Sequence, residues 1–143
     1  MTTAAHTGAT IIPTMRYRNA PEAIDWLCRA FGFETHAVYP NETGGIAHAQ
    51  LTLGNGMIMV GTASDEGIGR RMVLPGEIGG RQTQCPCVIV SDPDAHCARA
   101  KAAGAEIVYG VADQDYGGRA YACLDVEGYL WWFGSYDPWE TTS

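Results

Sequence analysis

Two polar side chains in an otherwise apolar segment, His48 and Gln50, have the types and spacing to do chemistry. Apolar and polar residues alternate along 46–53, and the apolar set is Ala47, Ala49, Leu51 and Leu53. Alternate residues of a β-strand point to opposite faces, so His48 and Gln50 should share the polar face. There they would hydrogen-bond a ligand, or His48 would act as a general base. The alternative is a polar position of the sheet that pairs with a neighbour or with water.

The last apolar segment of the chain carries two sets of aromatic side chains at alternating positions. One set is Trp132 and Tyr136, and the other is Trp131 and Phe133. We expect one set to pack under a helix and the other to line an open surface, where aromatic rings bind planar or apolar ligands. Met59 is expected near the same surface, because methionine adapts its shape to varied ligands. The alternative is that both sets belong to the core or to a dimer interface.

A loop near residue 116 combines one arginine with two tyrosines. Tyr116, Arg119 and Tyr121 follow a short acidic segment that contains Asp113 and Asp115. An arginine beside aromatic rings would clamp an anionic or carbonyl-bearing ligand. Equally, Arg119 would pair with Asp113 or Asp115 and pin the loop.

Cys85 and Cys87 place two thiols on one face of an expected strand. No Lys or His stands beside them in sequence to lower a thiol pKa, so we predict a buried and inert pair rather than a reactive one. The chain has five cysteines, an odd number at irregular spacing, which favours reduced thiols.

The elements that must position these residues occur twice in the chain. Residues 19–34 match residues 91–106 at an offset of 72, through Pro21/Pro93, Ala23/Ala95, Ala30/Ala102, Gly32/Gly104 and Glu34/Glu106. In each copy an N-cap residue, Asn19 or Ser91, precedes a proline, and a glycine ends the segment, as in helices. Two helices are therefore predicted. The first presents an apolar stripe of Ile24, Leu27, Cys28 and Phe31, and the second a small-residue stripe of Ala95, Ala98, Ala102 and Ala105.

The repeat extends to the strands, because Gly56 and Gly128 open an apolar run at the same offset. Each half is expected to run strand, helix and three strands. The predicted elements are 10–17, 20–31, 35–39, 46–53 and 57–62 in the first half, and 87–90, 92–103, 106–109, 119–124 and 130–136 in the second. We therefore predict an α+β fold in which two tandem βαβββ modules form a cup-shaped mixed sheet whose open face a ligand closes. The domain spans 1–143, with module one at 10–62, a linker at 63–84 and module two at 85–136.

Composition restricts the possible partners. The 143 residues are 46% hydrophobic and carry 16 acidic against 9 basic side chains, a net charge of -7. An acidic surface repels phosphate backbones, so nucleic acid is not expected to bind. No apolar run approaches the roughly 20 residues that span a bilayer, and no signal peptide is recognisable, so we expect a cytoplasmic protein without a membrane partner.

The paired modules resemble the vicinal oxygen chelate superfamily, which contains glyoxalase I, the bleomycin-resistance proteins and the extradiol dioxygenases. The resemblance is carried by NAPEAIDW at 19–26, by YGGR at 116–119 and by DVEGYLWWF at 125–133, and it spans about residues 10–136. It implies the same paired-module fold. It leaves the function open, because one scaffold carries many activities.

In metal-using members the resemblance implies four ligands, His or Gln and Glu, from the first and last strand of each module. The matching positions here are Pro13, Met59, Cys85 and Trp132. Only Cys85 has a strong ligating atom, and one thiolate does not make a site. We therefore predict no cofactor and no divalent metal, which disfavours a metal-dependent lyase or dioxygenase.

The leading prediction is a metal-independent, small-molecule binding protein of the bleomycin-resistance type, with an antibiotic-resistance role. It would hold a drug-like compound or metabolite in an aromatic-lined cup, and the predicted contacts are His48, Gln50, Met59, Tyr116, Arg119, Tyr121, Trp132 and Tyr136. The alternatives are a glyoxalase-like lyase, isomerase or dioxygenase that uses a divalent metal or His48 as base, and a paralogue whose cup its own side chains fill. Exposed sheet edges predict a homodimer.

Overall fold

The computed structural model describes residues 7–140, which form two compact units. Within the described residues, unit one comprises 7–28 and Gly32–Leu74, and unit two comprises Arg29–Phe31 and 75–140. Each unit contains one four-stranded mixed sheet. No helix of residues 7–140 is long and apolar enough to cross a membrane.

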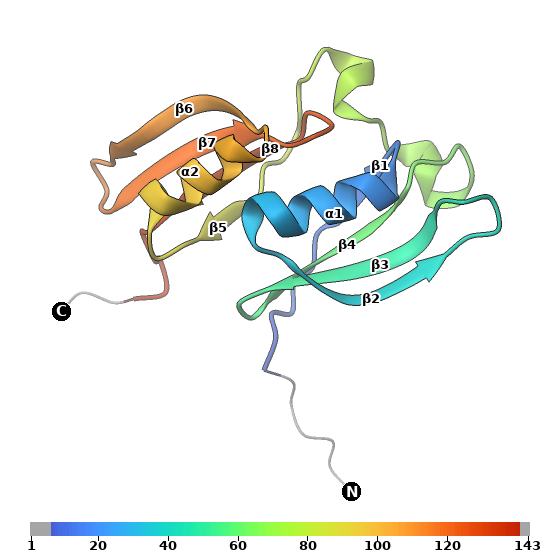
Figure 1. The fold of residues 1–143 in the computed structure, drawn as a ribbon, viewed down its shortest axis with the longest axis horizontal. Helices are drawn as coiled ribbons and strands as arrows, with labels where there is room; N and C mark the ends of the chain where they lie inside the picture. Colours follow the sequence, from blue (N-terminus) through green and yellow to red (C-terminus); the bar gives the residue numbers. More distant parts are fainter. Residues whose placement is uncertain (1–6, 141–143) are drawn as a thin grey trace, which may run out of the picture. The chain divides into compact units, whose positions relative to one another are not determined.

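The sheet of unit one has the strand order β1-β4-β3-β2 (Figure 1). Its strands are β1 (Thr14–Tyr17), β2 (Glu34–Pro40), β3 (Ile46–Leu53) and β4 (Gly56–Thr62). Strands β1 and β4 are parallel, and the other pairs are antiparallel. The connection that follows carries two short 3-10 helices, Gly67–Arg71 and Pro75–Ile78.

Helix α1 (Ala20–Phe31) begins and ends at the predicted residues. The Asn19 side chain accepts a hydrogen bond from the backbone N–H of Glu22, and Gly32 ends the helix in the left-handed conformation at φ 89°. The predicted apolar stripe is confirmed, since Ile24 and Leu27 are buried.

The sheet of unit two repeats this arrangement in the order β5-β8-β7-β6 (Figure 1). Its elements are β5 (Cys87–Ile89), α2 (Pro93–Ala102), β6 (Glu106–Asp113), β7 (Arg119–Leu124) and β8 (Leu130–Gly134). Helix α2 packs against β6 and β7, and the side chains of Trp131, Phe133, Tyr121 and Cys123 are fully buried. The predicted α+β fold of two βαβββ modules is therefore confirmed.

The predictions for the start and the inner face of α2 are wrong. Asp92, not Ser91, is the N-cap, and its carboxylate accepts from the backbone N–H of Ala95 at 3.1 Å. A one-residue shift rotates a helix face by about 100°. The three residues of the predicted small-residue stripe that lie inside the helix, Ala95, Ala98 and Ala102, are therefore exposed. The residues that face inward are Pro93, His96, Cys97 and Ala100.

The two copies align at an offset of 73 in their outer strands rather than at 72. The backbone N–H of Met59 donates to the carbonyl of Pro13 at 2.9 Å, and that of Trp132 donates to the carbonyl of Pro86 at 3.0 Å. Both residues of this hydrogen-bonded pair therefore recur 73 positions later in the second copy. The counterpart of Pro13 is thus Pro86, and the predicted match of Pro13 with Cys85 is wrong.

A β-bulge in β3 explains the change of offset inside each copy. The backbone N–H of Ile46 donates to the Thr62 hydroxyl, as that of Arg119 does to the Ser135 hydroxyl, which places Ile46 and Arg119 73 residues apart. Two residues separate Ile46 from the inward-facing Ala49 in β3. Only one residue separates Arg119 from the equivalent inward-facing residue of β7, Tyr121. The register of β2 with β3 shifts at this point. Ala47 is consequently exposed, whereas strict alternation predicted it in the buried set.

The turn before the last strand restores the offset of 73. It joins Leu53 to Gly56 in unit one, and it joins Asp125 to Tyr129 in unit two, with one residue more between the ends. Gly128 lies inside the longer turn at φ 92°, so it is not the counterpart of Gly56 as the repeat predicted.

Candidate functional site

The face of the unit-one sheet opposite the buried Ala49 and Leu51 carries His48, Gln50 and Met59, all half-buried. Gln50 and Met59 are directly paired neighbours on β3 and β4. The amide Nε2 of Gln50 lies 3.0 Å from Nε2 of His48. An amide nitrogen only donates, so in this arrangement His48 Nε2 accepts and its proton lies on Nδ1. The predicted shared face of His48 and Gln50 is confirmed.

Two further side chains on this face were not identified from the sequence. The ring of Tyr39 stacks on the imidazole of His48, with 6.1 Å between centroids and 19° between planes. Arg16 pairs with Gly61 across β1 and β4, and its Nη1 donates to the carbonyl of Thr62 at 3.2 Å. Both contacts depend on strand register, which the sequence alternation alone does not supply.

On unit two, the predicted opposite faces of Trp131 and Trp132 are confirmed, whereas Tyr136 lies beyond the end of β8 and not on the strand as predicted. Trp131 and Phe133 are fully buried against the ring of Phe31, at centroid distances of 5.2 and 4.7 Å. Trp132 lies on the opposite face and is half-buried. Its paired neighbours are Ala122 on β7 and Cys87 on β5.

Small and aromatic side chains neighbour Trp132 on this face of the sheet. Ala120 and Ala122 are small and almost completely covered, and Tyr109, paired with Ala122, is 68% exposed. Tyr109 belongs to edge strand β6, so its ring borders the row that contains Trp132. We name Trp132, Ala122 and Tyr109 the aromatic face of unit two.

Tyr116 and Tyr136 form a separate aromatic pair. Their rings meet edge to face, with 5.2 Å between centroids and 76° between planes, and both are about half exposed. The glycine turn between Tyr116 and Arg119 lies close to Tyr136, since a Cβ on Gly117 would be 3.5 Å from Tyr136 Cδ1. The structure therefore brings together two of the predicted contact residues.

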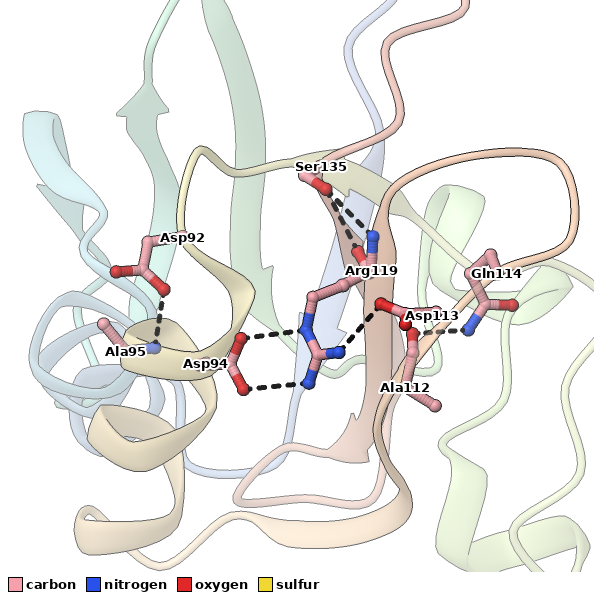
Figure 2. A network of polar contacts seen from close by, with 8 residues as sticks. All are labelled: Asp92, Asp94, Ala95, Ala112, Asp113, Gln114, Arg119 and Ser135. Carbon is pink, nitrogen blue, oxygen red and sulfur yellow. Dashed lines mark hydrogen bonds and ion pairs between the residues drawn. The ribbon is translucent and has the colours of Figure 1, made fainter.

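Arg119 projects toward helix α2 rather than to the open face (Figure 2). Its Nε and Nη2 donate to the two carboxylate oxygens of Asp94 at 3.0 and 3.2 Å, and its Nη1 donates to Asp113 at 2.8 Å. These hydrogen bonds to Asp94 and Asp113 raise the pKa of Arg119. Of the two alternatives, the observed one is the ion pair that fixes the loop, with Asp94 added to the predicted Asp113.

Tyr121 lies in the core of unit two and contacts a histidine that sequence reasoning missed. Its hydroxyl is 2.5 Å from His96 Nδ1, and His96 Nε2 is 3.0 Å from the carbonyl of Phe31. Burial raises the pKa of Tyr121 and lowers that of His96. Tyr121 is on the helix side of β7 with Cys123, so it does not share a face with Trp132 as the ligand prediction required. Correct placement of the α2 N-cap would have shown His96 facing inward.

Cys85 and Cys87 are both exposed, so the prediction that they are buried is wrong. Cys87 lies on edge strand β5, beside Trp132 and away from the helix-covered side. Partial desolvation raises the pKa of both thiols, and the neighbouring Cys87 raises that of Cys85 further.

The residues present do not fit the metal that the superfamily's metal-using members hold. The four corresponding positions carry Pro13, Met59, Pro86 and Trp132, and none has an imidazole or carboxylate. Both proline carbonyls already accept hydrogen bonds from the last strand of their sheet. Across residues 7–140, no three His, Cys, Asp or Glu side chains lie close enough together to hold an ion.

Comparison with known proteins agrees with this architecture. TioX from Micromonospora sp. ML1 is 36% identical, with a TM-score of 0.70 over 89% of this chain and 98% of that one. TnmS3, an antibiotic binding protein from Streptomyces sp. CB03234, shares the fold at 17% identity and a TM-score of 0.62, over 94% and 98% of the two chains. The uncharacterized protein Rv0887c of Mycobacterium tuberculosis (strain ATCC 25618 / H37Rv) is 29% identical over 122 residues, 85% of this chain and 71% of that protein. Residues 5–133 match the sequence model of one family, and the chain therefore belongs to the Glyoxalase/Bleomycin resistance protein/Dioxygenase superfamily.

Proposed function

We propose that this chain is a metal-independent binding protein for a small organic molecule, either a drug-like compound or a metabolite. One observation carries the proposal. Trp132 presents a half-buried aromatic ring on the open face of unit two, at a position where metal-using relatives carry a carboxylate. A ring of this kind, bordered by small side chains, favours planar or apolar ligands.

The counterpart position in unit one supports the same chemistry. Met59 is equivalent to Trp132, because each donates its backbone N–H to the proline that precedes the first strand of its sheet. A thioether is apolar and flexible and adapts to ligand shape. His48 and Gln50 lie beside Met59, so they supply the hydrogen bonds that would orient a ligand.

Charge favours a cationic ligand. The net charge of -7 attracts cations over long range. Arg119, which from sequence would have favoured anions, is neutralised by Asp94 and Asp113. TnmS3, a fold neighbour described as an antibiotic binding protein, is the reason to include antibiotics among the test compounds.

Tryptophan fluorescence tests this proposal directly. We expect a panel of planar and cationic compounds to contain at least one that quenches or shifts the emission of the wild type. Trp139→Phe is the matched control, because Trp139 is 86% exposed near the chain end, and it should keep the response. Trp132→Ala should weaken binding by about tenfold or more in calorimetry. Unchanged affinity in Trp132→Ala would show that the aromatic face of unit two is not the binding site.

Metal analysis tests the metal-independent part separately. Protein purified without chelator should hold far less than one divalent ion per chain, because the four family positions lack suitable ligands. About one tightly held divalent ion per chain would contradict this part of the proposal.

A second candidate, a metal-free isomerase or lyase, would use His48 as its base. The imidazole stacks on the ring of Tyr39, and its unprotonated Nε2 accepts from the amide of Gln50, so a substrate would have to displace that amide before His48 takes a proton. His48→Ala should abolish turnover if His48 is the base. If His48 is only a ligand contact, the same variant should bind a few-fold more weakly and show no other change.

A further inference from the structure

We propose that Cys85 and Cys87 form a site for a soft, two-coordinate cation such as Cu(I), at the start of edge strand β5 of unit two, where Cys87 pairs with Trp132. This goes beyond the proposed function, because it requires neither an organic ligand nor the family's metal positions. The site would be formed by two thiolates of a single segment.

Hydrogen bonds to the neighbouring strand anchor the segment that carries the two cysteines. The carbonyl of Pro86, between them, accepts a hydrogen bond from Trp132 at 3.0 Å, and Cys87 pairs with Trp132 in the parallel ladder. Proline also fixes its own φ. Residues two apart in an extended segment share a face at a spacing of about 6.6 Å between Cα atoms, so both thiols can turn toward one ion.

The two thiols are accessible and near each other in sequence. Cys85 and Cys87 are exposed, and one residue, Pro86, separates them. The Cys85 thiol donates to the carbonyl of Pro86 at 3.4 Å, a weak hydrogen bond that metal binding would replace. The other thiols differ, since Cys123 is fully buried, and Cys28 and Cys97 are half-buried on the two helices.

The number and type of ligands select the ion. Thiolates prefer soft ions, whereas hard divalent cations prefer oxygen. Zinc requires about four ligands, and within residues 7–140 no third His, Cys, Asp or Glu side chain joins the two thiols. Two sulfur ligands satisfy a soft cation of low coordination number. The ring of Trp132 on the adjacent strand adds an electron-rich surface near the ion.

Binding changes no oxidation state. Two S–H bonds break, two Cu–S bonds form, and the two protons pass to solvent, which leaves a bis-thiolate complex with one negative charge. Cu(I) enters from a small-molecule complex and therefore needs no reductant from the protein.

Competition with bicinchoninate under anaerobic conditions tests the site in the full chain. The wild type should withdraw about one Cu(I) per chain, with quenching of tryptophan emission. Cys85→Ser and Cys87→Ser should each weaken Cu(I) binding by at least about 100-fold, since even outer partners of a metal site contribute up to that factor. Excess Zn(II) should not displace the ion. Trp132→Phe should keep the stoichiometry and lose most of the quenching.

Cys97→Ser and Cys28→Ser are the matched controls, and both should bind Cu(I) as the wild type does. Near-UV circular dichroism identifies any variant that fails to fold. The proposal is overturned if the wild type withdraws no Cu(I), if the control variants lose as much affinity as Cys85→Ser, or if the stoichiometry is one ion per two chains. Cys85→Ser distinguishes the two proposals, because it should impair Cu(I) binding and leave organic-ligand binding intact.

Discussion

The His96 imidazole makes two hydrogen bonds inside unit two. A carbonyl only accepts, so Nε2 donates its proton to Phe31, and Nδ1 therefore accepts from the Tyr121 hydroxyl. The centroid of the His96 ring also lies 4.3 Å from the centroid of the Phe133 ring. Burial lowers the pKa of His96 below its ordinary value of 6.5, and the backbone hydrogen bond to Phe31 only partly opposes this effect.

The stability of the protein should therefore depend on pH. The unfolded chain binds a proton at His96 as the pH falls through about 6.5, whereas the folded protein resists protonation until a lower pH. The free energy of unfolding should thus decrease as the pH falls below about 6.5, until the folded pKa is passed. Urea denaturation in a series of buffers between about pH 7.5 and pH 5 measures this decrease.

His96→Phe provides the comparison, because it keeps a ring among the surrounding aromatic side chains and removes the titrating group. The variant should be less stable near pH 7.5 and should show a smaller change in stability between the two pH values. An unchanged pH dependence would assign the effect to other groups.

At the residue scale, the sequence predicted what depends on local alternation. The opposite faces of Trp131 and Trp132 follow from a period of two, and so does the shared face of His48 and Gln50. The contact of Tyr121 with His96 depends on how a helix packs on a sheet. That packing changes with a single residue at the helix start, which the sequence left ambiguous.

At the scale of elements, the start of α2 gives a direct test of that ambiguity. Asp92→Ala removes the carboxylate that accepts from Ala95 and should lower the free energy of unfolding by about 1 kcal/mol. Ser91→Ala, one residue earlier and exposed, should have little effect. Chemical denaturation of the two variants measures the difference, and a larger loss in Ser91→Ala would restore the N-cap predicted from the repeat.

The order of strands and helices was predictable because both copies carry strong local signals. Asparagine before the first helix, glycine after it and alternation in 46–53 each act over a few residues. The exact correspondence of the copies was not predictable. A bulge at Ala47 and a longer turn before Tyr129 change the offset in opposite directions, and each is visible only in the hydrogen-bond register.

At the scale of the whole molecule, exposed apolar side chains lie on two sheet edges. Val38 and Tyr39 are 39% and 56% exposed on β2, and Val108 and Tyr109 are 40% and 68% exposed on β6. An uncovered edge with apolar side chains invites pairing with another chain.

We therefore predict a homodimer, as the sequence suggested. Light scattering should give about twice the 15.4 kDa chain mass. Val38→Lys and Val108→Lys each place a charge on one edge, and the edge that forms the interface should be identified by loss of the dimer. Glu66→Lys, at an exposed position in the connection that follows β4, controls for a general effect of charge. A monomeric wild type at micromolar concentration would contradict the prediction.

The bulge at Ala47 also determines how the two halves of this chain can be recombined. The counterpart of Ile46 lies 73 residues further on, at Arg119, but the counterpart of Ala49 lies 72 further on. A chimera spliced between these points therefore gains or loses one residue, and a slip of one residue would turn every later side chain of the strand to the other face. Deleting Ala47 is the change that gives the first half the spacing of the second. The position of the bulge thus determines the strand register in any design that builds a symmetric protein from one half.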